Sequence, residues 1–180
     1  MAKPKLLLVD GSSLAFRAFF SILDLNRFKN SNGLHTNALY SFHRMFKAIL
    51  DSEKPTHVLV AWDAGKTTFR TEMYADYKGG RSKTPGEFIE QMPYFNVLLD
   101  AWGIPHYRLN QYEADDIIGT LAKQGEAAGY EVVVLSGDKD LIQLADNNIT
   151  VKITTKGVTE LVEYTPKVIF EKYGLTPEQI

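Results

Sequence analysis

The chain has 180 residues, 44% of them hydrophobic, which suits one globular domain with a sizeable core. It contains no cysteine, which excludes disulfide bonds and thiolate metal sites, and its four histidines show no ligand spacing, which argues against zinc. No apolar run is long enough to cross a membrane and the N-terminus has no signal-peptide pattern, so we expect a cytoplasmic protein.

The net charge of −2 hides an uneven distribution of charged residues. Residues 65–84 carry five basic and two acidic residues, a local balance of +3, whereas residues 110–148 carry eight acids and two bases, a balance of −6. A basic segment beside an acidic pocket suits a polyanionic ligand that approaches bound cations.

Three apolar runs, residues 5–10, 57–63 and 131–138, each lead into an aspartate: Asp10, Asp63 and Asp138. Continuous apolar runs of this length are typical of strands buried on both faces of a parallel sheet. Ligands of such sheets bind outside the carboxyl ends of the strands. The sequence therefore predicts one acidic pocket at this edge, to which Asp140 also belongs.

A fourth acidic group lies between the second and third strands, where Glu113, Asp115 and Asp116 precede a helical apolar pattern. Capping and first-turn charge preference account for one or two of these acids, but not for three acids together with three strands that end in aspartate. Crowded carboxylates repel one another, and Mg²⁺ or Mn²⁺ relieves that repulsion through oxygen ligands. We therefore predict a metal site rather than a set of unrelated caps.

The segment after Asp10 reads as a helix that Ser12 or Ser13 caps. Arg17 is the lone base among its apolar residues, and either a snorkelling surface role or a phosphate contact fits it. A loop over residues 24–36 follows, and Thr36 opens a second helix whose apolar stripe faces the core.

Residues 68–83 mix aromatic and basic residues with weak apolar periodicity. The segment fits either an ordinary solvated surface or an arm that binds nucleic acid, with bases for phosphates and aromatics for stacking. The preceding Gly65-Lys66-Thr67 is no Walker A loop, because the required first glycine is replaced by Val60.

Thr84 and Glu87 form a predicted capping box for the next helix, which Pro93 should kink. A short strand over 104–107, a helix from the Glu113 group to about Gly129, a hairpin over 149–163 and a helix from Thr165 complete the pattern. Strands that alternate with helices predict a doubly wound α/β fold. The helix-start signal at residues 176–179 has no helix behind it, so we expect a fragment of a longer protein.

The motifs together resemble a known family. They lie in family order at residues 8–13, 62–63, 69–70, 77–81, 112–116 and 137–141. The chain resembles the 5′ nuclease domain of bacterial DNA polymerase I, a member of the flap endonuclease superfamily with its PIN-like fold. The pair Glu-Ala-Asp-Asp and Gly-Asp-Lys-Asp-Leu is the most specific part of this resemblance.

The resemblance implies a mostly parallel central sheet with helices on both faces and a helical arch over about residues 66–84. The 1–180 domain would stop before a helix-hairpin-helix-like DNA-binding element. Two Mg²⁺ or Mn²⁺ ions are implied. The first would be served by Asp10, Asp63, Glu113 and Asp115, and the second by Asp116, Asp138 and Asp140. Lys78 and Arg81 would contact the scissile phosphate, and Arg17, Arg70 and Tyr77 would also contact DNA.

The implied activity is that of a divalent-metal-dependent 5′-3′ exonuclease and flap endonuclease, acting on branched DNA or RNA primers in bacterial replication and repair. A polymerase domain would follow in the same full-length chain. Two alternatives stay open: a PIN-type ribonuclease, and a catalytically incomplete DNA-binding fragment. A haloacid-dehalogenase-type phosphatase fits less well, because its second aspartate would stand where Ser12 is.

Overall fold

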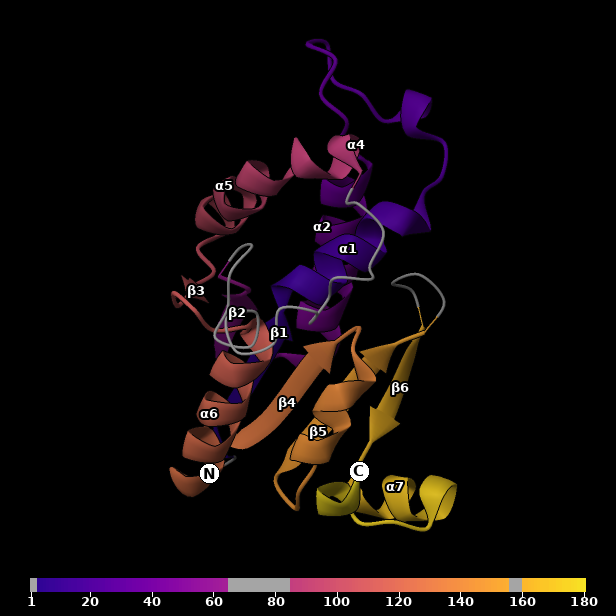
Figure 1. Ribbon diagram of the computed structural model, residues 1–180. Coiled ribbons are helices and arrows are strands. Elements are labelled where there is room, and N and C mark those ends of the chain that lie inside the picture. The colour runs from indigo at the N-terminus through magenta and orange to yellow at the C-terminus, as the bar shows by residue number, and fades with distance from the viewer. Residues whose placement is uncertain (1–2, 65–84, 156–159) are drawn as a thin grey trace.

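The computed structural model describes residues 3–64, 85–155 and 160–180. Its centre is a six-stranded sheet in the order β3-β2-β1-β4-β5-β6 (Figure 1). All neighbouring strands are parallel except β5 and β6, which pair antiparallel. The strands are β1 Lys5–Asp10, β2 His57–Trp62, β3 His106–Arg108, β4 Glu131–Ser136, β5 Ile149–Thr154 and β6 Leu161–Tyr164.

Helices cover both faces of this sheet. The α-helices are α1 Gly11–Ser21, α2 Asn37–Glu53, α4 Gly86–Ile89, α5 Met92–Trp102, α6 Ala114–Ala127 and α7 Pro166–Tyr173. In the described parts of the chain, three 3₁₀ turns accompany them: η1 Leu25–Arg27, η2 Lys139–Leu144 and η3 Pro177–Gln179.

The central strands feed two hydrophobic cores because their side chains alternate between the faces. On β1, Leu7 and Val9 pack with α1, α2, α4 and α5, whereas Leu8 packs with α6, η2 and α7. In Figure 1 these two layers lie on opposite sides of the sheet, with α6 nearer the viewer. The predicted doubly wound α/β arrangement is confirmed.

The strand order reverses beside β1. The chain runs from β1 outward to β2 and β3, then crosses to β4 on the other side of β1. Such a reversal separates the crossover connections and leaves a crevice at the carboxyl ends of the two strands. Asp10 ends β1 and Ser136 ends β4, so this crevice lies where the sequence predicted the acidic pocket.

Two local predictions about helix ends were wrong. The N-cap of α1 is Asp10, whose side chain accepts from the backbone N–H of Ser13, because the helix begins directly at the strand end. Pro93 does not kink a continuous helix, because the helix is interrupted at Glu90 and Gln91. The proline lies in the first turn of α5, where its missing N–H removes no helical hydrogen bond.

Two predicted features lie outside the described residues: the arch over residues 66–84 and the turn of the hairpin over 149–163. Thr84 lies outside them as well, but the helix that it was predicted to cap begins at Gly86 with Pro85 as its N-cap. Among the helices in the described parts of the chain, none combines the length and apolar character needed to span a bilayer.

Candidate functional site

Asp10 is the most deeply buried acidic residue of the crevice, with 3% of its surface exposed. Its Oδ1 accepts from the Ser13 N–H at 3.2 Å and its Oδ2 from the Ser136 hydroxyl at 2.8 Å. Burial raises the pKa of Asp10 to about 6, against the lowering effect of the Ser13 and Ser136 hydrogen bonds, and the nearby Asp63 charge adds to the rise. The carboxyl is thus held firmly in place in surroundings that disfavour its negative charge.

Three serine hydroxyls connect the ends of β1, β2 and β4. Ser12 Oγ accepts from the backbone N–H of Asp63 at 2.9 Å. Ser13 Oγ accepts from Gly137 N–H, and Ser136 Oγ from Asp138 N–H, each at 2.9 Å.

These cross-connections explain why Ser12 and Ser13 are not helix caps, since their hydroxyls serve neighbouring strands instead. Sequence reasoning missed this role. A Ser-Ser pair one glycine after an aspartate that ends a strand was the available signal.

The N-terminus of α6 is joined to the end of β2. Asp63 Oδ1 accepts from the Ala114 N–H at 2.7 Å, so the positive end of the helix dipole faces this carboxylate. A capping box closes the same turn, in which the Glu113 N–H donates to Asp116 Oδ2 at 3.0 Å. The predicted helix start is confirmed, and it carries its acids to the strand edge.

The pKa of Asp115 is affected by the charges of the other acidic residues. Its pKa is raised to about 7, first by burial and then by the negative charges of four further carboxylates. These are Asp10, Asp138, Asp63 and Glu113. Residues that are up to 128 positions apart in sequence therefore act on one group, because the parallel strands end at the same edge.

Asp138 caps η2 through its Oδ1, which accepts from the Asp140 N–H at 2.9 Å. A polar cavity of about 470 Å³ lies between this turn and α6. Its acidic lining residues are Glu113, Asp115, Asp116 and Asp140. The structure thus brings members of both predicted metal groups to one cavity.

The donor set fits a hard divalent cation, since carboxylate oxygens are its preferred ligands, and burial together with neighbouring carboxylates raises the pKa values of Asp10 and Asp115. Within residues 3–64, 85–155 and 160–180, however, no three acidic or histidine side chains form a finished coordination shell. The acidic residues bring negative charge to the crevice, but no three of the described side chains are arranged around a single metal position.

Arg17 lies under the turn that carries Asp138. Its Nε donates to the Gly137 carbonyl at 3.1 Å and its Nη1 to the Thr155 carbonyl at 3.0 Å. A Cβ on Gly137 would come within 2.6 Å of Arg17 Nε, so glycine permits this close packing. The predicted contact of Arg17 with DNA stays a prediction. The other predicted DNA contacts lie outside the described residues: Arg70, Tyr77, Lys78 and Arg81.

The sequence matches known relatives along its whole length. It is 61% identical over 180 residues to DNA polymerase I of Streptococcus pneumoniae (strain ATCC BAA-255 / R6), covering 99% of this chain and 20% of the relative. It is 60% identical over 178 residues to DNA polymerase I of Bacillus subtilis (strain 168), with the same shares covered. The chain spans about one fifth of the length of these relatives.

Solved structures share the fold. A mutant of the bacteriophage T5 5′-exonuclease superposes with a TM-score of 0.68 at 22% identity, covering 98% of this chain and 60% of that chain. The bacteriophage T5 flap endonuclease, described as a pseudo-enzyme-product complex with DNA and metal ions, gives a TM-score of 0.68 at 24% identity over 97% of this chain and 63% of that chain.

The family model described as "5′-3′ exonuclease, N-terminal resolvase-like domain" matches residues 5–174. The strand-end carboxylates and the PIN-like fold shared with the phage nucleases agree with this match. The chain therefore belongs to the family of 5′-3′ exonuclease N-terminal domains, the nuclease domain found in DNA polymerase I.

Proposed function

We propose that this chain hydrolyses phosphodiester bonds near the 5′ end of a branched or flapped DNA strand, with two Mg²⁺ or Mn²⁺ ions as cofactors. The observation that carries the proposal is the convergence of acidic side chains on one crevice at the carboxyl edge of the sheet, from the end of β1, the residues after β2 and β4, and the start of α6. Hydrogen bonds of 2.7 and 2.8 Å to Asp63 and Asp10 hold that crevice together.

We assign the carboxylates to two groups. Asp10, Asp63, Glu113 and Asp115 would hold the first ion, and Asp116, Asp138 and Asp140 the second, directly or through water. A pair of ions about 4 Å apart activates a water molecule and stabilises the leaving oxygen in phosphoryl chemistry. Because the described carboxylates do not close around one point, water and substrate oxygens would complete the coordination.

The chain's own residues would supply orientation. Ser136 donates to Asp10 and accepts from Asp138 N–H, so it links a first-group ligand to the turn of a second-group ligand. Such supporting hydrogen bonds fix the direction in which a carboxylate points and are worth about tenfold to a hundredfold in metal affinity or activity.

The basic residues would bind the substrate. We propose that Lys78 and Arg81 neutralise charge on the scissile phosphate and that Arg70 and Tyr77 contact the DNA strand. For Arg17, the carbonyl contacts support a role in holding the Gly137 turn, with any DNA contact made from that position.

The test is cleavage of a 5′-labelled flap duplex in Mg²⁺, in Mn²⁺ and in EDTA, with single-stranded RNA as the comparison substrate. We expect metal-dependent release of short 5′ products from the flap. Preferential cleavage of the single-stranded RNA would favour a PIN-type ribonuclease, and binding of the flap without cleavage at saturating Mn²⁺ would favour a binding module.

The same assay compares the 180-residue chain with an extended form that continues as the longer relatives do. We propose that the extended form adds DNA-backbone contacts and further second-group ligands, followed by a polymerase domain. It should therefore cleave faster and bind DNA with a steeper salt dependence. Equal rates for the two forms would contradict this account of the second ion.

A further inference from the structure

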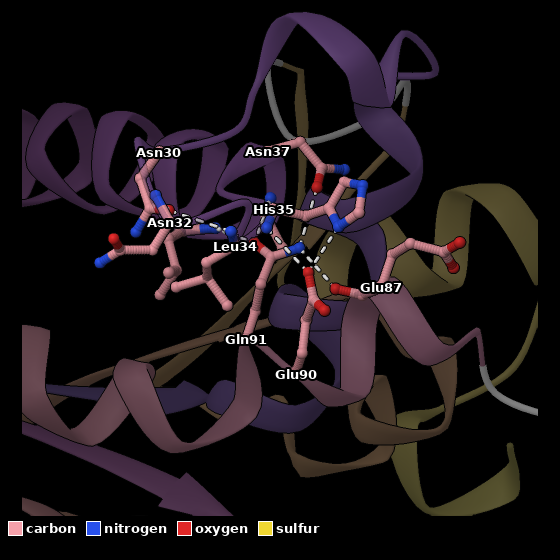
Figure 2. A network of polar contacts seen from close by, with 10 residues as sticks. Asn30, Asn32, Leu34, His35, Asn37, Glu87, Glu90 and Gln91 are labelled. Atoms are coloured by element: carbon pink, nitrogen blue, oxygen red, sulfur yellow. Dashed lines mark hydrogen bonds and ion pairs between the residues drawn. The ribbon is translucent and has the colours of Figure 1, made fainter.

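Two buried amide side chains, Asn37 at the start of α2 and Gln91 just before α5, bind each other (Figure 2). Gln91 Nε2 donates to Asn37 Oδ1 at 2.9 Å and to the Glu87 carbonyl at 2.8 Å. Gln91 Oε1 accepts from the N–H groups of Ala38 and Leu39 at 3.0 and 3.2 Å. We call this pair the amide clamp.

The amide clamp also fixes the C-terminal end of α1. Asn37 Nδ2 donates to the Phe19 carbonyl at 2.9 Å and to the Ile22 carbonyl at 3.4 Å, at the place where α1 leaves carbonyls without helical partners. Buried Phe88 of α4 packs edge-on against Phe16 and Phe19, with ring centroids 5.9 and 5.5 Å apart. Both polar and aromatic contacts thus hold α4 and Gln91 onto α1.

The chain that enters residues 65–84 is held at the other end of the same helix. Asp63 N–H donates to Ser12 Oγ at 2.9 Å, and Ala64 N–H donates to the Tyr112 carbonyl at 3.1 Å. The two flanks of the basic segment are therefore attached to opposite ends of α1, whose 11 residues make a rod of about 16 Å.

We propose that Asn37 and Gln91 are positioning residues of the nuclease, which fix the point where the basic segment returns to the fold relative to Asp10. The inference rests on the proposed function, since it concerns how the chain bearing Lys78 and Arg81 is anchored. The clamp is suited to this role because a buried amide pair is strongly directional and costly to break, whereas an apolar contact tolerates sliding.

The experiment compares Gln91→Met with Val151→Ala in the extended form. Gln91→Met keeps the side-chain length and removes the four hydrogen bonds of Gln91, whereas Val151→Ala destabilises the other core, far from the clamp. Both variants are assayed at the same number of degrees below their own melting temperatures. We expect Gln91→Met to lower kcat for flap cleavage about tenfold, because a small displacement of a group that positions the substrate slows the reaction. We expect Val151→Ala to leave kcat unchanged and both variants to retain the Mn²⁺-induced rise in melting temperature.

A double-mutant cycle with Arg81→Ala separates positioning from general damage. If the clamp acts through the basic segment, Gln91→Met should cost much less in the Arg81→Ala background than in the wild type. Equal costs in both backgrounds, or a kcat loss no larger than that of Val151→Ala, would overturn the proposal.

A distance measurement tests the clamp without any cleavage. The chain has no cysteine, and the space around a Cβ at Gly86 is open, so spin labels at Gly86→Cys and Lys47→Cys report where the segment returns. Gln91→Met should broaden or shift this distance distribution. An unchanged distance distribution refutes the positioning role of the clamp, whether or not the protein cleaves DNA. A changed distribution supports that role, even if the wild type does not cleave DNA and the proposed function is wrong.

Discussion

The two ends of α1 hold polar groups in opposite ways. At the N-terminal end, Asp10 and Asp115 lie among other carboxylates, and their pKa values are raised to about 6 and about 7. At the C-terminal end, Asn37 and Gln91 are neutral, and every one of their side-chain polar atoms has a hydrogen-bond partner.

This difference separates a group of like charges, which a bound cation or protons can neutralise, from a pair of neutral amides that needs no ligand. Crowded carboxylates cost stability until a cation or protons neutralise them, whereas the amide clamp is complete within the protein itself. Changes at the two ends should therefore have opposite signs.

The largest expected effect is that of Asp10→Asn. We expect cleavage of a 5′ flap to fall about a thousandfold, the upper range for removing one group that supports transition-state charge. In EDTA the same change should stabilise the fold by less than about 3 kcal/mol, the value that corresponds to the pKa rise of Asp10 from 3.8 to about 6, because the amide keeps only one of the two acceptors that Ser13 and Ser136 use. Urea unfolding in EDTA measures this gain, and a loss of stability would contradict it.

The pH dependence of the metal-free protein probes the same end of α1. Both raised pKa values mean tighter proton binding in the folded state, so the contribution of Asp10 and Asp115 to stability should fall as pH rises from about 3.8 to about 7. The lowered pKa of Glu53 opposes this fall only below its ordinary value of 4.5, so the fall should dominate above that pH. Unfolding curves in EDTA across this range test the slope. Saturating Mn²⁺ should reduce the fall at its upper end, and an unchanged slope would count against a cation at these carboxylates.

Asn37→Ala should act in the opposite direction at the other end of α1. It removes the donor to the Phe19 carbonyl and the partner of Gln91 and leaves buried groups unsatisfied, so we expect a loss of about 3 kcal/mol. Because no carboxylate is involved, the loss should be the same with and without Mn²⁺. A loss that disappears in Mn²⁺ would show that the two ends are not independent.

Ser136→Ala should combine both behaviours. The change removes a donor to Asp10 and an acceptor for Asp138 N–H inside the protein, which should cost about 2 kcal/mol. It should also weaken the Mn²⁺-induced rise in melting temperature, since the hydroxyl orients a proposed ligand. Thermal melts with a Mn²⁺ titration measure both, and a normal titration would limit Ser136 to a structural role.

The smallest effects compare two glycines next to the acidic crevice. A Cβ on Gly11 would lie 2.8 Å from Val60 Cγ1 and 3.0 Å from the Trp62 ring, so Gly11→Ala should cost about 1–2 kcal/mol through overpacking and move Asp10 away from Asp63. A Cβ on Gly137 would lie 2.6 Å from Arg17 Nε, and this side chain can move away at the expense of its carbonyl hydrogen bonds, so Gly137→Ala should cost at most about 1 kcal/mol. Equal losses of melting temperature would contradict this contrast.

The strands that end at Asp10, Trp62 and Ser136 could be predicted from the sequence, because long apolar runs and abrupt polar stops are local properties of the chain. The helix start at Glu113 could also be predicted, from its capping residues. From these elements alone, one acidic edge of a parallel sheet could be predicted.

The hydrogen-bond partners across that edge depend on how the elements pack in three dimensions. The hydroxyls of Ser12 and Ser13 were available for a local cap, but parallel pairing placed the ends of β2 and β4 within their reach. Asn37 and Gln91 carry no distinctive sequence signal, since they meet across 54 residues only after α1, α2 and α5 pack. Hydrogen-bond partners of this kind depend on where whole elements come to rest, which side-chain periodicity does not encode.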